Sequence, residues 1–197
     1  MQSKNAPDNP TDALKIYELS LIWKEAAYNF AFWENLMPLS DWDKAYRDAL
    51  PAVLATRNLY DYYLELMKFV ALLRDGHTDV KMPQSIEENP AYASGLPIFM
   101  TYSNGEYVVS DIKRVAGEKV KQWSVVKKIN GQDVYEYVAQ HVFPYVWHEK
   151  LDSASWLVSC FISDGPLGSK MDFELEHGGE ISTVTLERTK GDADWLQ

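Results

Sequence analysis

Residues 123–138, WSVVKKINGQDVYEYV, change their pattern halfway along the stretch. The first half is rich in β-branched residues and ends at Ile129, as a short strand does. Asn130 and Gly131 follow, and an Asn-Gly pair favours the positive φ angles of a tight turn. Val134 then leads into a segment of helical character. The stretch therefore predicts a strand, a tight turn and a helix in direct succession.

Two predicted hairpins lie on either side of this stretch. Residues 95–113, GLPIFMTYSNGEYVVSDIK, form two β-prone runs joined at an Asn-Gly pair, residues 104–105. Residues 171–188, MDFELEHGGEISTVTLER, alternate on both sides of Gly178 and Gly179. Together these segments predict a small α+β module, built as a β-sandwich or a partly open barrel.

The first third of the chain has helical patterns instead. Thr11 or Asp12 can cap a first helix, and Ser40 is the expected N-cap of a second, which Pro51 should kink or divide. The third helix has one apolar face, made of Leu59, Tyr63, Leu66, Val70 and Leu73. Three helices with short connections predict a small helical bundle.

The composition excludes several classes of protein. The chain has 197 residues, 46% of them hydrophobic and 13% aromatic, which argues against disorder. A net charge of -10 counts against sequence-independent nucleic-acid binding and against docking on an anionic membrane. No stretch approaches the ~20 uninterrupted apolar residues of a membrane span. Cys160 is the single cysteine and cannot form an internal disulfide.

Residues 72–83, LLRDGHTDVKMP, join the helical third to the strand-rich part and contain a histidine, His77. From the residues alone, this junction is a helix end. Gly76 suits the left-handed turn beyond a helix C-terminus, and Asp75 or His77 can satisfy backbone groups there. A metal site is not expected in this chain. The His-Glu pair at 148–149 has no second histidine four residues on, because Asp152 stands there.

The strand-rich part resembles a PDZ domain. Residues 117–134, GEKVKQWSVVKKINGQDV, match the strand–turn–helix signature from Val125 on, with Gln122-Trp123-Ser124 in place of the usual Gly-Asp. The loop that takes a peptide's C-terminal carboxylate in PDZ domains resembles Gly95, Leu96, Pro97 and Ile98 of this chain. The resemblance implies that backbone N–H groups of this loop bind the carboxylate and that the peptide adds to a strand edge. Pro97 removes one of these donors.

The order of the parts resembles the front half of the tail-specific, or C-terminal processing, serine peptidases, a group that includes the tricorn core protease. The resemblance runs from about Tyr17 to Arg188. It implies a helical domain over residues 1–85, a PDZ-like domain over 86–190, and a tail, 191–197, that leads towards a catalytic domain absent from this chain. The whole enzyme would cleave peptide bonds near protein C-termini, and this chain alone would be inactive.

The resemblance also implies a catalytic role for His77, the general base that activates a serine nucleophile. An ordinary imidazole, with a pKa of about 6.5, suits proton transfer near neutrality. Gly76 stands where the tricorn protease has a serine that orients the histidine, and other members of the group use a serine–lysine dyad. No cofactor is implied. The implied partners are protein or peptide C-termini, the missing catalytic domain and a second copy of the chain, and relatives often act in the cell envelope.

Two other interpretations remain open from the sequence. The chain can be a complete PDZ-like peptide-binding or scaffold protein without catalysis, in which the junction at His77 is only a helix cap. It can also be an unrelated α+β domain whose Ile-Asn-Gly turn arises by chance.

Overall fold

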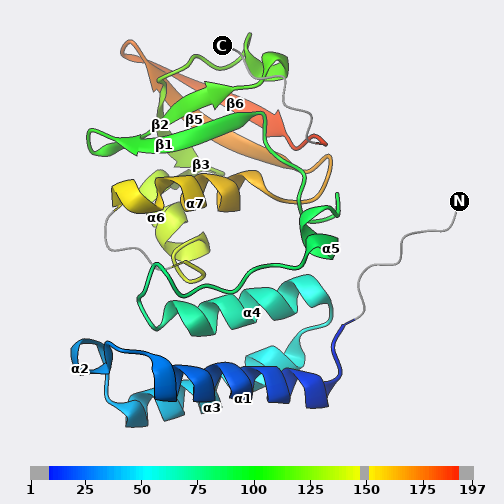
Figure 1. Cartoon of the computed structure of the whole chain (residues 1–197). Helices are drawn as coiled ribbons and strands as arrows, with labels where there is room; N and C mark the ends of the chain where they lie inside the picture. Colours follow the sequence, from blue (N-terminus) through cyan, green and yellow to red (C-terminus); the bar gives the residue numbers. More distant parts are fainter. Residues whose placement is uncertain (1–8, 147–150, 191–197) are drawn as a thin grey trace, which may run out of the picture. The chain divides into compact units, whose positions relative to one another are not determined.

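The computed structural model describes residues 9–146 and 151–190, which divide into two compact units (Figure 1). The helical unit comprises the chain up to Ile86 together with Tyr145 and Val146. The sheet unit comprises residues 87–144 and 151–190. Over the described residues, every helix is too short or too polar to cross a bilayer.

The helical unit contains helices at each place where the sequence predicts one. Its elements are α1 (Asp12–Asn29), α2 (Trp33–Leu36), α3 (Leu39–Ala55), α4 (Leu59–Ala71) and α5 (Gln84–Glu87), the last reaching into the sheet unit. Thr11 is the N-cap of α1, as predicted, since its hydroxyl accepts a hydrogen bond from the Leu14 N–H.

Two details of α3 differ from the prediction. The helix begins at Leu39, with Pro38 in the N-cap position, so Ser40 lies inside the first turn and does not cap the helix. Pro51 does not divide α3, which continues to Ala55. Proline removes one hydrogen bond from the helix ladder, but Val53 beyond it is fully buried, and this packing supports the last turn.

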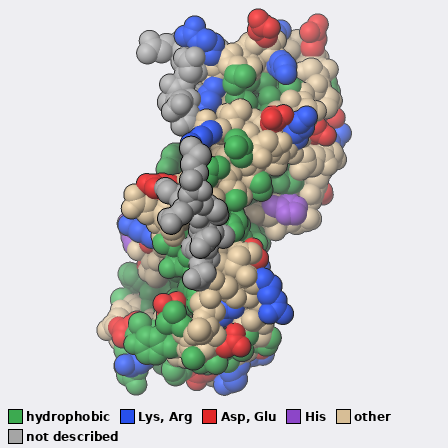
Figure 2. Space-filling view, turned by 90° about the vertical axis from the view of Figure 1, so that its right-hand side faces the viewer, with side chains coloured by type: hydrophobic (Ala, Val, Ile, Leu, Met, Phe, Trp, Pro, Cys, Tyr) green, Lys and Arg blue, Asp and Glu red, His purple; other side chains and the backbone are tan. Residues whose placement is uncertain are grey.

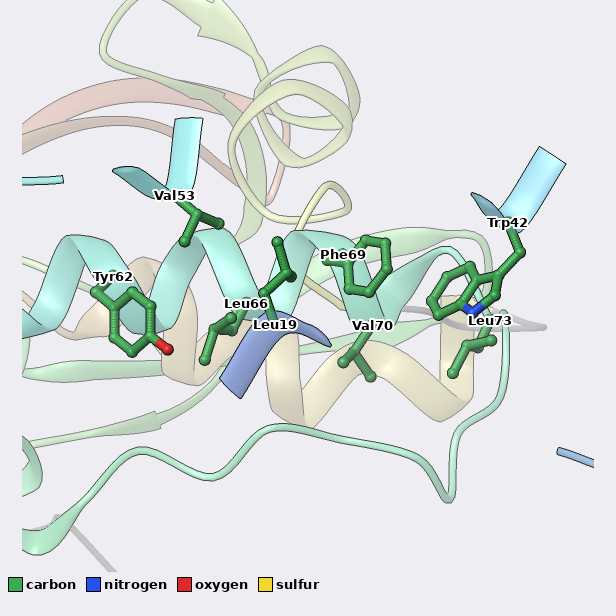
Figure 3. Packing of buried hydrophobic residues seen from close by; sticks show 8 residues of the cluster. All are labelled: Leu19, Trp42, Val53, Tyr62, Leu66, Phe69, Val70 and Leu73. Carbon is green, nitrogen blue, oxygen red and sulfur yellow. The ribbon is translucent and has the colours of Figure 1, made fainter. Parts of the chain in front are cut away.

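The core of the helical unit is a single cluster centred on α4 (Figure 3). It consists of Leu19, Trp42, Val53, Tyr62, Leu66, Phe69, Val70 and Leu73. The rings of Trp42 and Phe69 stack with their centroids 4.3 Å apart. The predicted apolar face of α4 is confirmed in part, because Tyr62 and Phe69 are buried while Leu59 and Tyr63 are only partly buried at its rim.

The sheet unit is an open antiparallel sheet with two helices. Its strands are β1 (Ile98–Ser103), β2 (Glu106–Ile112), β3 (Val125–Ile129), β4 (Gln132–Asp133), β5 (Lys170–His177) and β6 (Glu180–Glu187). They lie in the order β1-β2-β3-β5-β6, with β4 paired to β3. A short 3₁₀ helix (Arg114–Ala116) follows β2, and the two longer helices are α6 (Val134–His141) and α7 (Leu151–Ser163).

The α+β class is thus confirmed, but the predicted sandwich or partly open barrel is wrong. Closing the sheet would need β1 to pair with β6, and these are the two terminal strands of the described sheet. The free side of β1 instead lies against α7 (Figure 1), which takes up the hydrogen-bonding groups that barrel closure would require.

All three predicted turns of the sheet unit are confirmed. The left-handed pairs are Asn104 and Gly105 (φ 53° and 87°), Asn130 and Gly131 (φ 51° and 80°), and Gly178 and Gly179 (φ 61° and 84°). Two adjacent positive φ angles match the twist of the flanking strands. The helix after the second turn is also confirmed, and Asp133 caps it by accepting the N–H groups of Tyr135 and Glu136.

Candidate functional site

The loop after α4 carries His77 and begins with an unexpected left-handed residue. Arg74 has φ 51°, and its N–H donates to the Ala71 carbonyl at 3.1 Å. The prediction that Gly76 makes this turn is therefore wrong, because the reversal occurs immediately at the helix end, two residues earlier. The φ of Gly76 is not in the positive range, and a Cβ there would meet nothing within 4 Å. The backbone at Gly76 thus accepts other residues.

The Asp75 carboxylate, and not the imidazole of His77, organises this loop. It accepts hydrogen bonds from the Thr78 hydroxyl at 2.6 Å and from the His77 N–H at 3.2 Å. The Thr78 hydroxyl is the main cause that lowers the pKa of Asp75, and the His77 N–H and side chain add to it, against an opposing effect of burial. The His77 side chain is exposed. Its ring is therefore not needed to cap the helix, and its role as a general base stays a prediction.

Replacing Thr78 with valine is expected to raise the pKa of Asp75, because the strongest donor to the charged carboxylate is removed. A lowered pKa stabilises the fold above the unfolded-state pKa, and that stabilisation disappears as the pH falls through the folded value. The variant should therefore lose less stability on acidification than the wild type. An NMR titration of the Asp75 carboxyl carbon measures the change, with Thr101→Val in the sheet unit as control. An unchanged Asp75 titration in Thr78→Val would contradict the assignment.

The predicted carboxylate-binding loop, Gly95 to Ile98, is engaged with the chain itself. The Gly95 N–H donates to the Thr189 carbonyl at 3.1 Å. The Leu96 N–H donates to the carbonyl and the hydroxyl of Ser163, at 3.2 and 3.0 Å. Pro97 has no N–H, and Leu96 and Ile98 are each 2% exposed. A peptide carboxylate can bind here only if these bonds open, so carboxylate binding stays a prediction with this condition attached.

A row of serines on α7, which the sequence reasoning missed, lies along the free side of β1. Ser159 Oγ accepts the Met100 N–H at 2.9 Å, and Ser155 Oγ lies 3.4 Å from the Thr101 hydroxyl. With Ser163, these serines recur every four residues and so share one face of the helix. That spacing was the available signal. It indicates a polar face on a helix, but it does not indicate that the face meets a strand.

The C-terminal end of α7 is capped by Arg188. Its guanidinium donates to the carbonyls of Ser163 at 2.7 Å and Ile162 at 2.8 Å, and to the Ser169 hydroxyl at 3.1 Å. A cation at this position satisfies the last carbonyls of a helix and complements its dipole. Arg188 is 7% exposed, so its position is fixed by the surrounding chain. Gly165 passes directly beside it.

Replacing Gly165 with alanine is expected to destabilise the sheet unit by about 2–3 kcal/mol. The new Cβ would lie 2.6 Å from Arg188 Nε, so the guanidinium must move and release the carbonyls of α7. Gly76→Ala is the matched control, since it adds the same methyl group in open space and should change stability by less than about 0.5 kcal/mol. Urea denaturation measures both variants. Equal stabilities for the two would contradict this account of Gly165.

Other side chains give no second site. Burial raises the pKa of the half-buried Cys160 thiol to about 11, so it is not an activated nucleophile at neutral pH. Within residues 9–146 and 151–190, no three His, Cys, Asp or Glu side chains are grouped so that they could bind a metal ion. The His-Glu pair at 148–149 lies outside the described residues. Acidic and basic side chains are interspersed on the face shown in Figure 2.

The fold described above is similar to part of a serine protease. The similar structures are those of CPAF, a chlamydial serine protease. An S499A mutant matches with 13% identity and a TM-score of 0.64, and mature CPAF in complex with lactacystin with 16% identity and a TM-score of 0.64. Mature CPAF matches with 15% identity and a TM-score of 0.60. Each match covers 89% of this chain and 34% of the CPAF chain, so the chain spans about a third of that protease's length.

Searches by sequence give no further relatives. No family model matches the chain, and no curated protein matches it. At these low identities, the likeness to CPAF concerns the fold.

Proposed function

We propose that this chain is the front portion of a serine peptidase, with His77 as general base for a serine on a catalytic domain outside residues 1–197. The similarity of fold to CPAF over 89% of the chain is the observation that carries the proposal. The exposed imidazole on a loop fixed by Asp75 supports it, because a general base needs a fixed backbone and an accessible ring.

The proposed chemistry is acyl transfer. The serine hydroxyl attacks the peptide carbonyl while His77 takes its proton, and His77 then gives that proton to the leaving amine. Water hydrolyses the acyl-enzyme by the same route, so no cofactor is consumed. This role requires the ring nitrogen of His77 to reach the serine hydroxyl, which makes the histidine essential for turnover and unnecessary for folding.

The substrate is proposed to be an unfolded protein or peptide that is cut near its C-terminus. The order of motifs, with a His-containing loop before a PDZ-like module, resembles the tail-specific peptidases and supports this class. We assign the sheet unit the role of a PDZ-like module that presents or gates the substrate, since β-sheet edges bind extended peptides through main-chain hydrogen bonds.

The test is to incubate the whole natural protein with reduced, carboxymethylated α-lactalbumin, which cannot refold, and to map the products by mass spectrometry. The expected result is a set of cuts near the C-terminus that a fluorophosphonate inhibitor prevents. A version of the substrate with a C-terminal amide is the control for carboxylate recognition and should be cut more slowly. Cuts spread evenly along the substrate would reject C-terminal processing, and cleavage that resists the inhibitor would reject a serine nucleophile.

A further inference from the structure

The free side of β1 is closed by side chains of α7 in place of another strand. A terminal strand presents unpaired N–H groups, which proteins normally cover or use to bind a further strand. In this chain the N–H groups of Leu96 and Met100 donate to Ser163 and Ser159, and Thr101 contacts Ser155. The serine hydroxyls therefore occupy positions where carbonyl oxygens of an added peptide would lie.

The apolar part of the contact between α7 and the sheet is made by modest side chains. The residues of α7 buried at steps of four are Ala154, Val158 and Ile162. The space enclosed by α7, β1 and Phe173 of β5 leaves no room for a water molecule. Ligand and helix therefore cannot occupy this edge together, and a peptide can reach it only if α7 moves.

The strength of this closure favours exchange. Each neutral hydrogen bond from a backbone N–H to a serine hydroxyl contributes little in net terms, because both groups can bond to water instead. A peptide strand would return the same acceptors to Leu96 and Met100 and add a regular main-chain ladder. The exchange of α7 for a peptide thus leaves no buried N–H of β1 without an acceptor.

We propose that the free edge of β1, from Leu96 to Thr101, is a binding site for an extended peptide segment, and that α7 is its displaceable cover. The serine row, Ser155, Ser159 and Ser163, mimics the peptide and closes the site when no ligand is bound. The identification of this peptide with the substrate segment rests on the proposed peptidase function; the cover itself does not.

The test uses the chain of residues 1–197 with Thr101→Cys and Ser155→Cys, in a Cys160→Ser background. The two hydroxyl oxygens are 3.4 Å apart, so a disulfide at this place ties α7 to β1. Amide hydrogen exchange is followed by NMR at Met100, with Phe173 of the central strand β5 as reference. In the reduced form, Met100 should exchange at least about 100-fold faster than Phe173, through an opening of α7 alone. Oxidation should remove that difference.

Binding is tested with reduced, carboxymethylated α-lactalbumin as the extended-chain probe. It should bind the reduced variant and lose at least about tenfold in affinity on oxidation. Met100 and Phe173 exchanging at the same rate in the reduced form would overturn the proposal of a displaceable cover. Fast exchange without a difference in probe binding would overturn the assignment of a peptide site. Neither result depends on peptidase activity, because the chain in this test lacks the proposed nucleophile.

Should the disulfide fail to form, Ser159→Ala serves as the second variant, with exchange measured at Leu96. Leu96 is bonded to Ser163 and does not contact Ser159, so its exchange changes only if α7 opens as a unit. We expect it to exchange about fivefold faster, which corresponds to the loss of one hydrogen bond of about 1 kcal/mol. An unchanged Leu96 rate would contradict opening of α7 as a unit.

Discussion

Replacing His77 with alanine in the whole natural protein is expected to reduce kcat for peptide hydrolysis by about 10²–10⁴, with KM nearly unchanged. Without the base, the serine hydroxyl must lose its proton to water, so the loss falls on the chemical step. The fold should not change, because the His77 side chain is exposed and the loop is organised by Asp75 and Thr78. Steady-state kinetics with an unfolded substrate gives both constants.

The matched control for this variant is His141→Ala. His141 is an exposed histidine at the end of α6 in the sheet unit, so it tests whether the loss follows from removing any surface imidazole. Its kcat should equal that of the wild type. If His77→Ala retained full turnover, a lysine or another base would perform the proton transfer, and the role proposed for His77 would be wrong.

Replacing Trp42 with alanine is expected to destabilise the helical unit by about 3–5 kcal/mol. The indole is fully buried, stacks on Phe69, and its N–H donates to the Trp23 carbonyl at 3.0 Å. The variant loses this apolar burial and leaves a cavity beside α4, together with a carbonyl that has lost its donor. Urea denaturation followed by far-UV circular dichroism should show the helical transition at a lower urea concentration.

Trp156→Ala provides the control for Trp42→Ala. Trp156 on α7 is 63% exposed, so its removal should change stability by less than about 0.5 kcal/mol. A similar loss in both variants would show that the two tryptophans contribute equally, which would contradict the description of Trp42 as the central residue of the core.

The features that the sequence predicts well are local ones. Asn104 and Asn130, each followed by glycine, adopt positive φ angles because a tight turn requires them whatever surrounds it. The same holds for Thr11, whose hydroxyl caps the helix that follows it. The predictions at Ser40 and Gly76 fail because another residue nearby could start the helix or reverse the chain, and sequence alone does not choose between them.

The features that the sequence predicts poorly depend on distant contacts. Whether a sheet closes is decided by what covers its terminal strands, and the serines that cover β1 come from a helix more than fifty residues later. The engagement of the Leu96 N–H with Ser163 is another contact of this kind. His77 was singled out by family resemblance, since an exposed histidine after a helix is by itself an ordinary feature.

The most direct test of the central claim is to label the whole natural protein with a fluorophosphonate and to compare the rate with that of His77→Ala. This reagent reacts with a serine hydroxyl that a base has activated. The account predicts that one serine outside residues 1–197 is labelled, and that His77→Ala slows this labelling at least about 100-fold. Equal labelling rates in the two proteins, or a protein that is not labelled at all, would contradict it.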